Sequence, residues 1–281
     1  MISAEGKRRQ LLSHQEHKQQ FISEISIIVF HISPAICCTD VALRAGTRGL
    51  ISSPPPTPLS FTRVTCLLLS VCLIGIMVKC VAVIVSGCGV YNGTDIHEAS
   101  AVLVHLSRAG AKVRMFAPNA DQMYVVNHCQ GTPTDEKRNI LQESILNESC
   151  RVHSWGFSVA KNLSDWAVKN KDCTILPHLG KLIKDFHKAG RPLSMCCISP
   201  ILAAKIRPGC ELTVRQDKEC EKWTAGVVKE MGCKHVNKDV EEAHINVKNK
   251  LFTTCAFMCN APIHKVFDGI GIMVKETLKL A

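Results

Sequence analysis

Residues 80–87, with the sequence CVAVIVSG, place the strongest constraint on the fold of this chain. The run is apolar, rich in β-branched residues and closed by a glycine, as is typical of strands buried on both faces of a parallel sheet. Residues 95–110 then show helical periodicity up to a glycine, and residues 111–118 have the pattern of a second strand. This strand–helix–strand succession predicts an α/β sheet with right-handed crossovers.

The rest of the chain continues the alternation of helices and strands. Helices are expected at residues 181–190, 200–206, 224–235 and 261–281, and strands at 191–197 and within 249–257. Glycine stops, such as Gly190, mark where helical periodicity ends. We therefore interpret residues 77–281 as one α/β domain.

Residues 1–76 differ in character from this domain and are interpreted as a poorly structured leader. The apolar run at 64–78 is shorter than the roughly 20 residues that span a bilayer, so no stable membrane partner is expected. A marginal membrane segment stays open as an alternative. Residues 44–64 resemble part of a mitochondrial transit peptide, whereas three glutamates farther upstream do not fit one.

The composition argues against two classes of function. The formal net charge is +10, but Lys and Arg are scattered and aromatic residues amount to only 5%, so nucleic acid is not an expected partner. The chain has 16 cysteines without any Cys-x-x-Cys pair, which favours neither a disulfide framework nor a zinc ribbon. We expect mostly reduced, buried thiols and no bound metal, which suits cytosol or mitochondrial matrix.

The glycine-rich stretch SGCGVYNGTDIHE at 86–98 leaves the first strand and enters the first helix. Its glycine spacing has one residue too many for the dinucleotide fingerprint, and no ribose-binding acid follows the second strand, so a close-packed turn is favoured over nucleotide binding. The turn delivers Glu98 to the carboxyl end of the sheet, where α/β proteins bind ligands. The alternative is a structural charge favoured by the helix dipole.

The stretch SMCCISP at 194–200 has the shape of a nucleophile elbow, with a strand, a sharp turn and a helix. A thiol at such a turn lies near helix amides, which lower its pKa. A buried structural cysteine at the end of a strand is the alternative. Either Cys196 or Cys197 faces the turn, because adjacent side chains do not point the same way.

Six blocks of the sequence resemble the ThiJ/PfpI (DJ-1) superfamily. They are SGCGVYNGTDIHEAS, VHLSRAGAKVRMFAP, AKNLSDWAV, CCISPILAAK, TTCAFM and DGIGIMV, in this order over about two hundred residues. Within the superfamily they are similar to the mitochondrial ES1 proteins and the enhancing-lycopene-biosynthesis proteins, which are also called glutamine amidotransferase-like class 1 domain proteins. The resemblance implies a flavodoxin-like, doubly wound, mostly parallel sheet, a mitochondrial location and a homodimer.

The resemblance also implies three site residues. The reactive cysteine of the superfamily, three residues before a proline, corresponds to Cys197 with Pro200, which leaves Cys196 pointing into the sheet. The carboxylate partner corresponds to Glu98, which when protonated would donate to a Cys197 thiolate and hold the pKa of that thiol low. A glycine whose amide helps to form an oxyanion pocket corresponds to Gly156.

Three departures from the family pattern bear on activity. Trp155 replaces a glycine in the loop that carries Gly156, and a bulky side chain there would narrow the pocket. About twenty residues that normally supply a central strand are missing, so residues 149–154 must substitute or the sheet is incomplete. The histidine that many superfamily enzymes carry after the elbow helix is also missing.

Two functions follow as expectations. The first is an ES1-like mitochondrial protein that is weakly active or non-catalytic, with a redox-sensitive elbow cysteine. The alternative is a glyoxalase- or deglycase-like enzyme that needs no cofactor and acts on small reactive aldehydes through Cys197 and Glu98.

Overall fold

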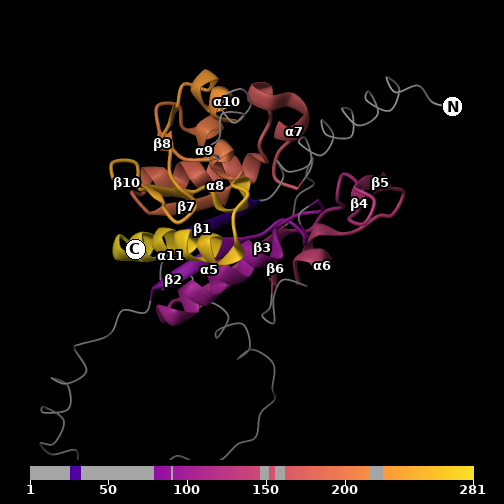
Figure 1. Ribbon diagram of the computed structural model, residues 1–281, viewed down its shortest axis with the longest axis horizontal. Helices are drawn as coiled ribbons and strands as arrows, with labels where there is room; N and C mark the ends of the chain where they lie inside the picture. The colour runs from indigo at the N-terminus through magenta and orange to yellow at the C-terminus, as the bar shows by residue number, and fades with distance from the viewer. Residues whose placement is uncertain (1–25, 33–78, 90, 146–151, 156–161, 215–223) are drawn as a thin grey trace, which may run out of the picture.

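The computed structural model describes residues 26–32, 79–89, 91–145, 152–155, 162–214 and 224–281. Its main body is a seven-stranded sheet with helices on both sides (Figure 1). Helices α5 (Ile96–Arg108) and α11 (Ile263–Lys279) pack together on one side. Helices α8 (Pro177–Lys188) and α9 (Pro200–Ile206) pack together on the other side, against strand β7 (Leu193–Cys197).

The sheet has the order β10-β11-β7-β1-β2-β3-β6. Its other strands are β1 (Ser26–Ile32), β2 (Cys80–Ile84), β3 (Lys112–Pro118), β6 (Val152–Trp155), β10 (His244–Asn246) and β11 (Leu251–Thr254). The pairings make β2, β3, β6, β7 and β11 run in one direction, with β1 and β10 opposed. All residues of β2 are buried, as predicted for a strand covered on both faces, and all residues of β7 are buried as well. The predicted doubly wound, mostly parallel α/β sheet is confirmed.

Shorter elements complete the described residues. They are β4 (Val125–Asn127), β5 (Thr132–Thr134), α6 (Ile140–Ile145), α7 (Trp166–Lys169), η2 (Asn170–Asp172), β8 (Glu211–Leu212), α10 (Thr224–Glu230), β9 (Lys234–His235) and η3 (Ala256–Met258). The helix expected over 224–235 is too long, because Gly232 adopts a φ of +77° and the chain then enters β9.

Strand β1 corrects the expectation for the leader. Residues 26–32 lie in the centre of the sheet and pair antiparallel with β2 on one side and β7 on the other. The interpretation of residues 1–76 as poorly structured is therefore wrong for this strand, while the rest of that range lies outside the described residues. The mostly apolar sequence SIIVFHI suits such a position, because helices cover both faces of the sheet.

The segment expected to replace the missing central strand lies elsewhere. Its described part, residues 152–154, belongs to β6 (Val152–Trp155) at the outer edge of the sheet, which pairs with β3, where Met115 lies opposite Val152. The place between β2 and β7 belongs to β1 instead. The described sheet is thus continuous, with a central strand that comes from far upstream in the sequence.

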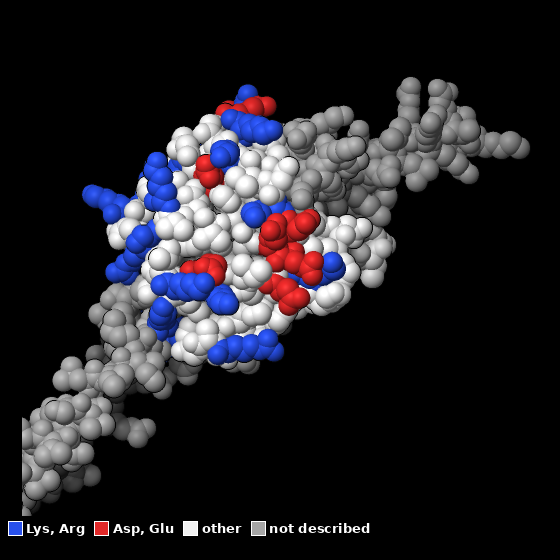
Figure 2. Space-filling view, turned by 60° about the vertical axis from the view of Figure 1, so that its left-hand side comes forward, with Lys and Arg blue, Asp and Glu red and all other residues white. Residues whose placement is uncertain are grey.

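The surface of the described part carries charges of both signs. Figure 2 shows Lys and Arg spread around one face, with Asp and Glu gathered among them. Several exposed ion pairs join them, including Lys265 with Glu241 at 3.0 Å and Lys181 with Asp185 at 2.6 Å. Among the described residues, no helix is both long and apolar enough to cross a membrane. The apolar run at 64–78 lies outside them.

Candidate functional site

Cys197 occupies a strained turn at the end of β7. Its backbone has a φ of +60°, a left-handed conformation that costs free energy in a residue with a Cβ atom. Helix α9 begins at Pro200, so the chain changes from strand to helix within three residues. This is the strand–turn–helix geometry of a nucleophile elbow, as the sequence predicted.

Glu98 reaches the same region from the first turn of α5. Asp95 caps this helix, and its Oδ1 accepts hydrogen bonds from the amides of His97 (2.9 Å) and Glu98 (3.1 Å). The Glu98 side chain turns inward and is fully buried. Its Oε1 accepts a hydrogen bond from the Phe257 amide at 3.0 Å, and its buried carboxyl group also interacts with the Cys197 thiol, although Oε2 makes no well-oriented hydrogen bond among the described residues.

Burial raises the pKa of Glu98 to about 8, and the nearby carboxylate of Asp95 contributes in the same direction. The hydrogen bond from the Phe257 amide favours the charged form but does not outweigh the desolvation. Glu98 is therefore mostly protonated at neutral pH.

The environment of Cys197 differs from the expectation. Burial raises the pKa of its thiol well above the usual value of 9.0, and Glu98 and Cys196 act in the same direction. The amide of Ile198 favours the thiolate, but desolvation is the larger effect. The expectation of a lowered pKa at the elbow is thus wrong.

Neither elbow cysteine faces the solvent, because both Cys196 and Cys197 have an exposed fraction of 0%. Strand β1 runs beside them, with Ser26 opposite Cys197 in the ladder. On the other side, Thr254 of β11 pairs with Cys196. The segment that follows β11 packs against β7, and its Phe257 amide donates a hydrogen bond to Glu98.

Sequence reasoning missed Cys255, which lies near Cys197. Its thiol is buried, and its pKa is raised by Cys259, by burial and by Cys197. The sequence could have indicated that Cys255 lies near Cys197, because the carboxyl ends of parallel neighbouring strands meet at one edge of a sheet. Cys255 directly follows β11, and Cys197 ends β7.

The predicted oxyanion residue Gly156 lies outside the described residues, and so does the side chain of Trp155. The pocket that these residues were expected to form or to narrow remains a prediction. Among the described residues, no cluster of three or more His, Cys, Asp or Glu side chains is placed to hold a metal ion.

The glycine-rich turn after β2 is filled by the protein itself. A Cβ atom at Gly93 would lie 2.3 Å from the carbonyl oxygen of Ser86, and Gly87 has a φ of +94°. The side chain of Asn162, which sequence reasoning missed, donates to that Ser86 carbonyl at 2.6 Å. These contacts agree with a close-packed turn and explain the glycines without a nucleotide.

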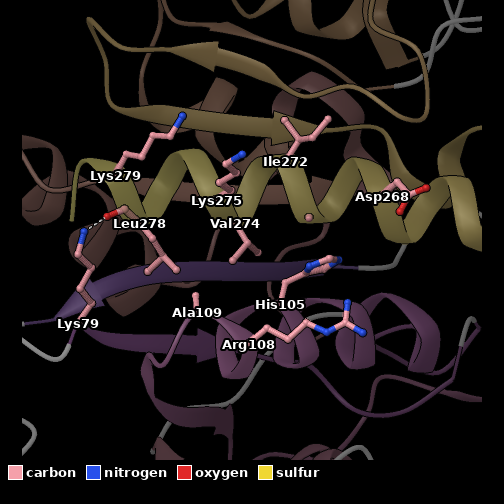
Figure 3. A pocket seen from close by; sticks show the side chains of 11 residues that line it. Lys79, His105, Arg108, Ala109, Asp268, Ile272, Val274, Lys275, Leu278 and Lys279 are labelled. Carbon is pink, nitrogen blue, oxygen red and sulfur yellow. Dashed lines mark hydrogen bonds between the residues drawn. The ribbon is translucent and has the colours of Figure 1, made fainter.

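A separate groove of about 710 Å³ lies between α5 and α11 (Figure 3). Its polar lining residues are Lys79, His105, Arg108, Asp268, Lys275 and Lys279. The ammonium group of Lys79 donates a hydrogen bond to the carbonyl oxygen of Leu278 at one end of the groove. Neither Glu98 nor Cys197 lines this groove, so it is distinct from the elbow site.

Comparison with known proteins places this chain in a family. No protein-family model matches the chain. The human glutamine amidotransferase-like class 1 domain-containing protein 3, mitochondrial, is 47% identical over 221 residues, which are 71% of this chain and 82% of the relative. The rat ES1 protein homolog, mitochondrial, is also 47% identical over 221 residues, which are 83% of that relative. The chain belongs to the ES1 family.

Solved structures agree with this membership. An Ehrlichia chaffeensis isoprenoid biosynthesis protein with an amidotransferase-like domain is 26% identical, with a TM-score of 0.62 over 70% of this chain and 98% of that one. The ThiJ/PfpI-like fold and the ES1 branch inferred from the sequence blocks are confirmed. The ES1 relatives are named as mitochondrial proteins, which confirms the expected mitochondrial location.

Proposed function

We propose that this ES1-family protein is non-catalytic or only weakly active toward small aldehydes, and that its elbow thiol is a redox-sensitive group that reacts when the site opens. The observation that carries the proposal is the complete burial of Cys197 beside the buried carboxyl of Glu98. Because the thiolate is both the nucleophile and the readily oxidised form, a buried thiol with a raised pKa is poorly suited to rapid turnover.

The neighbouring thiols support the redox part of the proposal. Cys196 precedes Cys197 in the strand, and Cys255 lies near it on the adjoining segment. Once the site opens, a hydroperoxide would oxidise the Cys197 thiolate to a sulfenic acid and be reduced to water or an alcohol. Condensation of the sulfenic acid with the Cys255 thiol would form a disulfide and release water.

Thiol labelling tests whether the elbow is closed. We expect limiting iodoacetamide to modify Cys197 roughly 100-fold more slowly in the native chain than in urea, because local opening of about 3 kcal/mol must precede the reaction. Cys129 is exposed and serves as an internal control that reacts at similar rates in both conditions. Quantitative peptide mapping gives both rates. Native labelling of Cys197 as fast as that of Cys129 would show an open elbow and contradict the proposal.

The second candidate function is the glyoxalase-like reaction, and one observation favours it. A mostly protonated Glu98 lies beside a cysteine held in a strained elbow, which pairs a proton donor with a nucleophile. In this reaction the Cys197 sulfur adds to an aldehyde carbonyl and forms a hemithioacetal. Glu98 moves a proton between the adjacent carbons, and water hydrolyses the resulting thioester to a hydroxy acid and the free thiol.

Methylglyoxal distinguishes the two functions. We expect the purified full chain to form lactate weakly or not at all, since the buried thiol leaves little thiolate for addition. The Cys197→Ser variant gives the background rate, and a chiral lactate assay measures the product. Robust lactate formation that disappears in this variant would make the enzyme the better assignment.

A further inference from the structure

A second pair of cysteines, Cys210 and Cys233, lies apart from the elbow and close together. Their sulfur atoms are 3.5 Å apart, although the residues are separated by 23 positions in the sequence. Each cysteine directly precedes a strand of the parallel pair β8–β9, in which Glu211 lies opposite Lys234. The Lys234 amide donates to the Cys210 carbonyl at 2.9 Å, and the Gly209 amide donates to the Gly232 carbonyl at 2.9 Å. The two cysteines are therefore held by backbone hydrogen bonds on both sides.

This register matches the requirements of a disulfide. Neighbouring strands lie about 4.8 Å apart, within the range of roughly 4.4–6.8 Å that joins the Cα atoms of a cystine. Partners in register on parallel strands project to the same face of the sheet. The sulfur atoms need to approach by about 1.5 Å to reach the bond length of about 2.05 Å, which small side-chain rotations supply.

Arg207 provides a second, independent observation. Its side chain is buried, its Nη2 donates to the Asn249 carbonyl at 2.8 Å, and its Nε has no hydrogen-bond partner among the described residues. No described carboxylate forms an ion pair with it. The thiols of Cys210 and Cys233 are the neighbours that favour its positive charge. A buried guanidinium beside two thiols favours one thiolate in the pair.

We propose that Cys210 and Cys233 form a reversible redox disulfide, with a hydroperoxide as the oxidant. The Cys233 thiolate attacks the peroxide oxygen, the O–O bond breaks, and Cys233 becomes a sulfenic acid while hydroxide or alkoxide leaves and takes up a proton. The Cys210 sulfur then attacks the Cys233 sulfur, a sulfur–sulfur bond replaces the sulfur–oxygen bond, and water is released. A thiol reductant restores the two thiols by exchange.

The order of attack follows from the environment of the two thiols. The hydrogen bond with the Cys210 thiol lowers the pKa of Cys233, and Arg207 acts in the same direction. Donating this hydrogen bond raises the pKa of Cys210. In its thiol form Cys233 donates instead to the carbonyl oxygens of Ala204 and Arg207, each at 3.5 Å. Cys233 is also slightly more exposed, at 6% against 2% for Cys210. Access at Cys233 suits a small oxidant such as hydrogen peroxide better than a bulky disulfide.

The test uses the reduced full chain treated with hydrogen peroxide, quenched with N-ethylmaleimide and digested under non-reducing conditions. We expect the Cys210–Cys233 linked peptide, lighter by two hydrogen atoms than the two free peptides, as the main cross-link. We also expect the oxidised chain to melt roughly 5–10 °C higher than the reduced chain, because the bond closes a loop of 23 residues. Dithiothreitol should reverse both changes.

Variants separate this pair from the other cysteines. Cys210→Ala and Cys233→Ala should each abolish the cross-link and the rise in melting temperature. Cys210→Ser keeps a hydrogen-bond donor beside Cys233 and should leave a Cys233 sulfenic acid that dimedone traps. Cys173→Ala removes a buried cysteine outside the pair and should keep both effects. Folding of each variant is checked by its unfolding transition. A native chain whose Cys210–Cys233 pair stays reduced in peroxide would overturn the proposal, as would a cross-link of this pair that forms only in urea or one that joins Cys210 or Cys233 to a different cysteine.

Discussion

A chain shortened to begin at Met77 should not fold, although the sequence pattern places the start of the domain there. This chain lacks β1, which occupies the centre of the sheet and pairs with β2 and β7 along both edges. Their facing amide and carbonyl groups would lose their partners, at about 1–3 kcal/mol for each group left unsatisfied. The sum exceeds the roughly 5–15 kcal/mol that stabilises a typical domain. We expect aggregation, and no cooperative unfolding transition by circular dichroism.

A matched chain that begins at residue 24 separates the effect of β1 from that of a shorter leader. It keeps Ser26–Ile32 and should unfold with a midpoint close to that of the full chain. A point variant within β1 gives a second comparison. Val29→Pro removes a backbone donor from a central strand and should destabilise the full chain strongly. Cooperative unfolding of the Met77 chain at the full-length midpoint would show that β1 is dispensable.

The Glu98→Gln variant should become more stable, relative to the unaltered chain, as the pH rises. In the folded chain burial raises the pKa of Glu98 to about 8 from an ordinary value of 4.5. An acid with a raised folded pKa contributes stability below its unfolded pKa, and this contribution is lost as the pH rises through the folded pKa. Between pH 5 and 7 the unaltered chain should lose about 2–3 kcal/mol relative to the variant, at about 1.4 kcal/mol per unit of pKa shift.

Urea unfolding at a series of pH values measures this difference. Glu230→Gln makes the same chemical substitution at an exposed carboxylate and serves as the matched comparison. Placing a glutamine amide in the site changes the free energy of unfolding by the same amount at every pH. This change does not affect the result, because only the slope of the free energy of unfolding against pH is compared. Parallel stability curves for the unaltered chain and Glu98→Gln would mean that Glu98 is charged in the folded protein, and the interpretation of the site would fall with it.

Local sequence patterns were sufficient to predict those helices and strands whose own residues specify them. The run at 80–87 predicted β2, and the periodicity of 95–110 predicted α5 within one or two residues at each end. The convergence of Glu98 and Cys197 followed from the rule that ligands lie at the carboxyl ends of parallel strands, and from the family resemblance. Cys255 obeys the same rule but escaped notice, because its block had no assigned role.

The sequence alone determined the strand–helix succession and the turn at the elbow, because periodicity, glycines and helix caps act over a few residues. The family resemblance indicated Glu98 as the acid that faces this turn. Only the tertiary structure decided that β1 completes the sheet, that both elbow cysteines are buried, and that Cys210 meets Cys233. These features depend on pairing between segments far apart in the chain, which leaves no local pattern to read. The same packing raises the pKa of Cys197, which was expected to be lowered, because desolvation depends on the residues that surround the thiol in space and not on its neighbours in sequence.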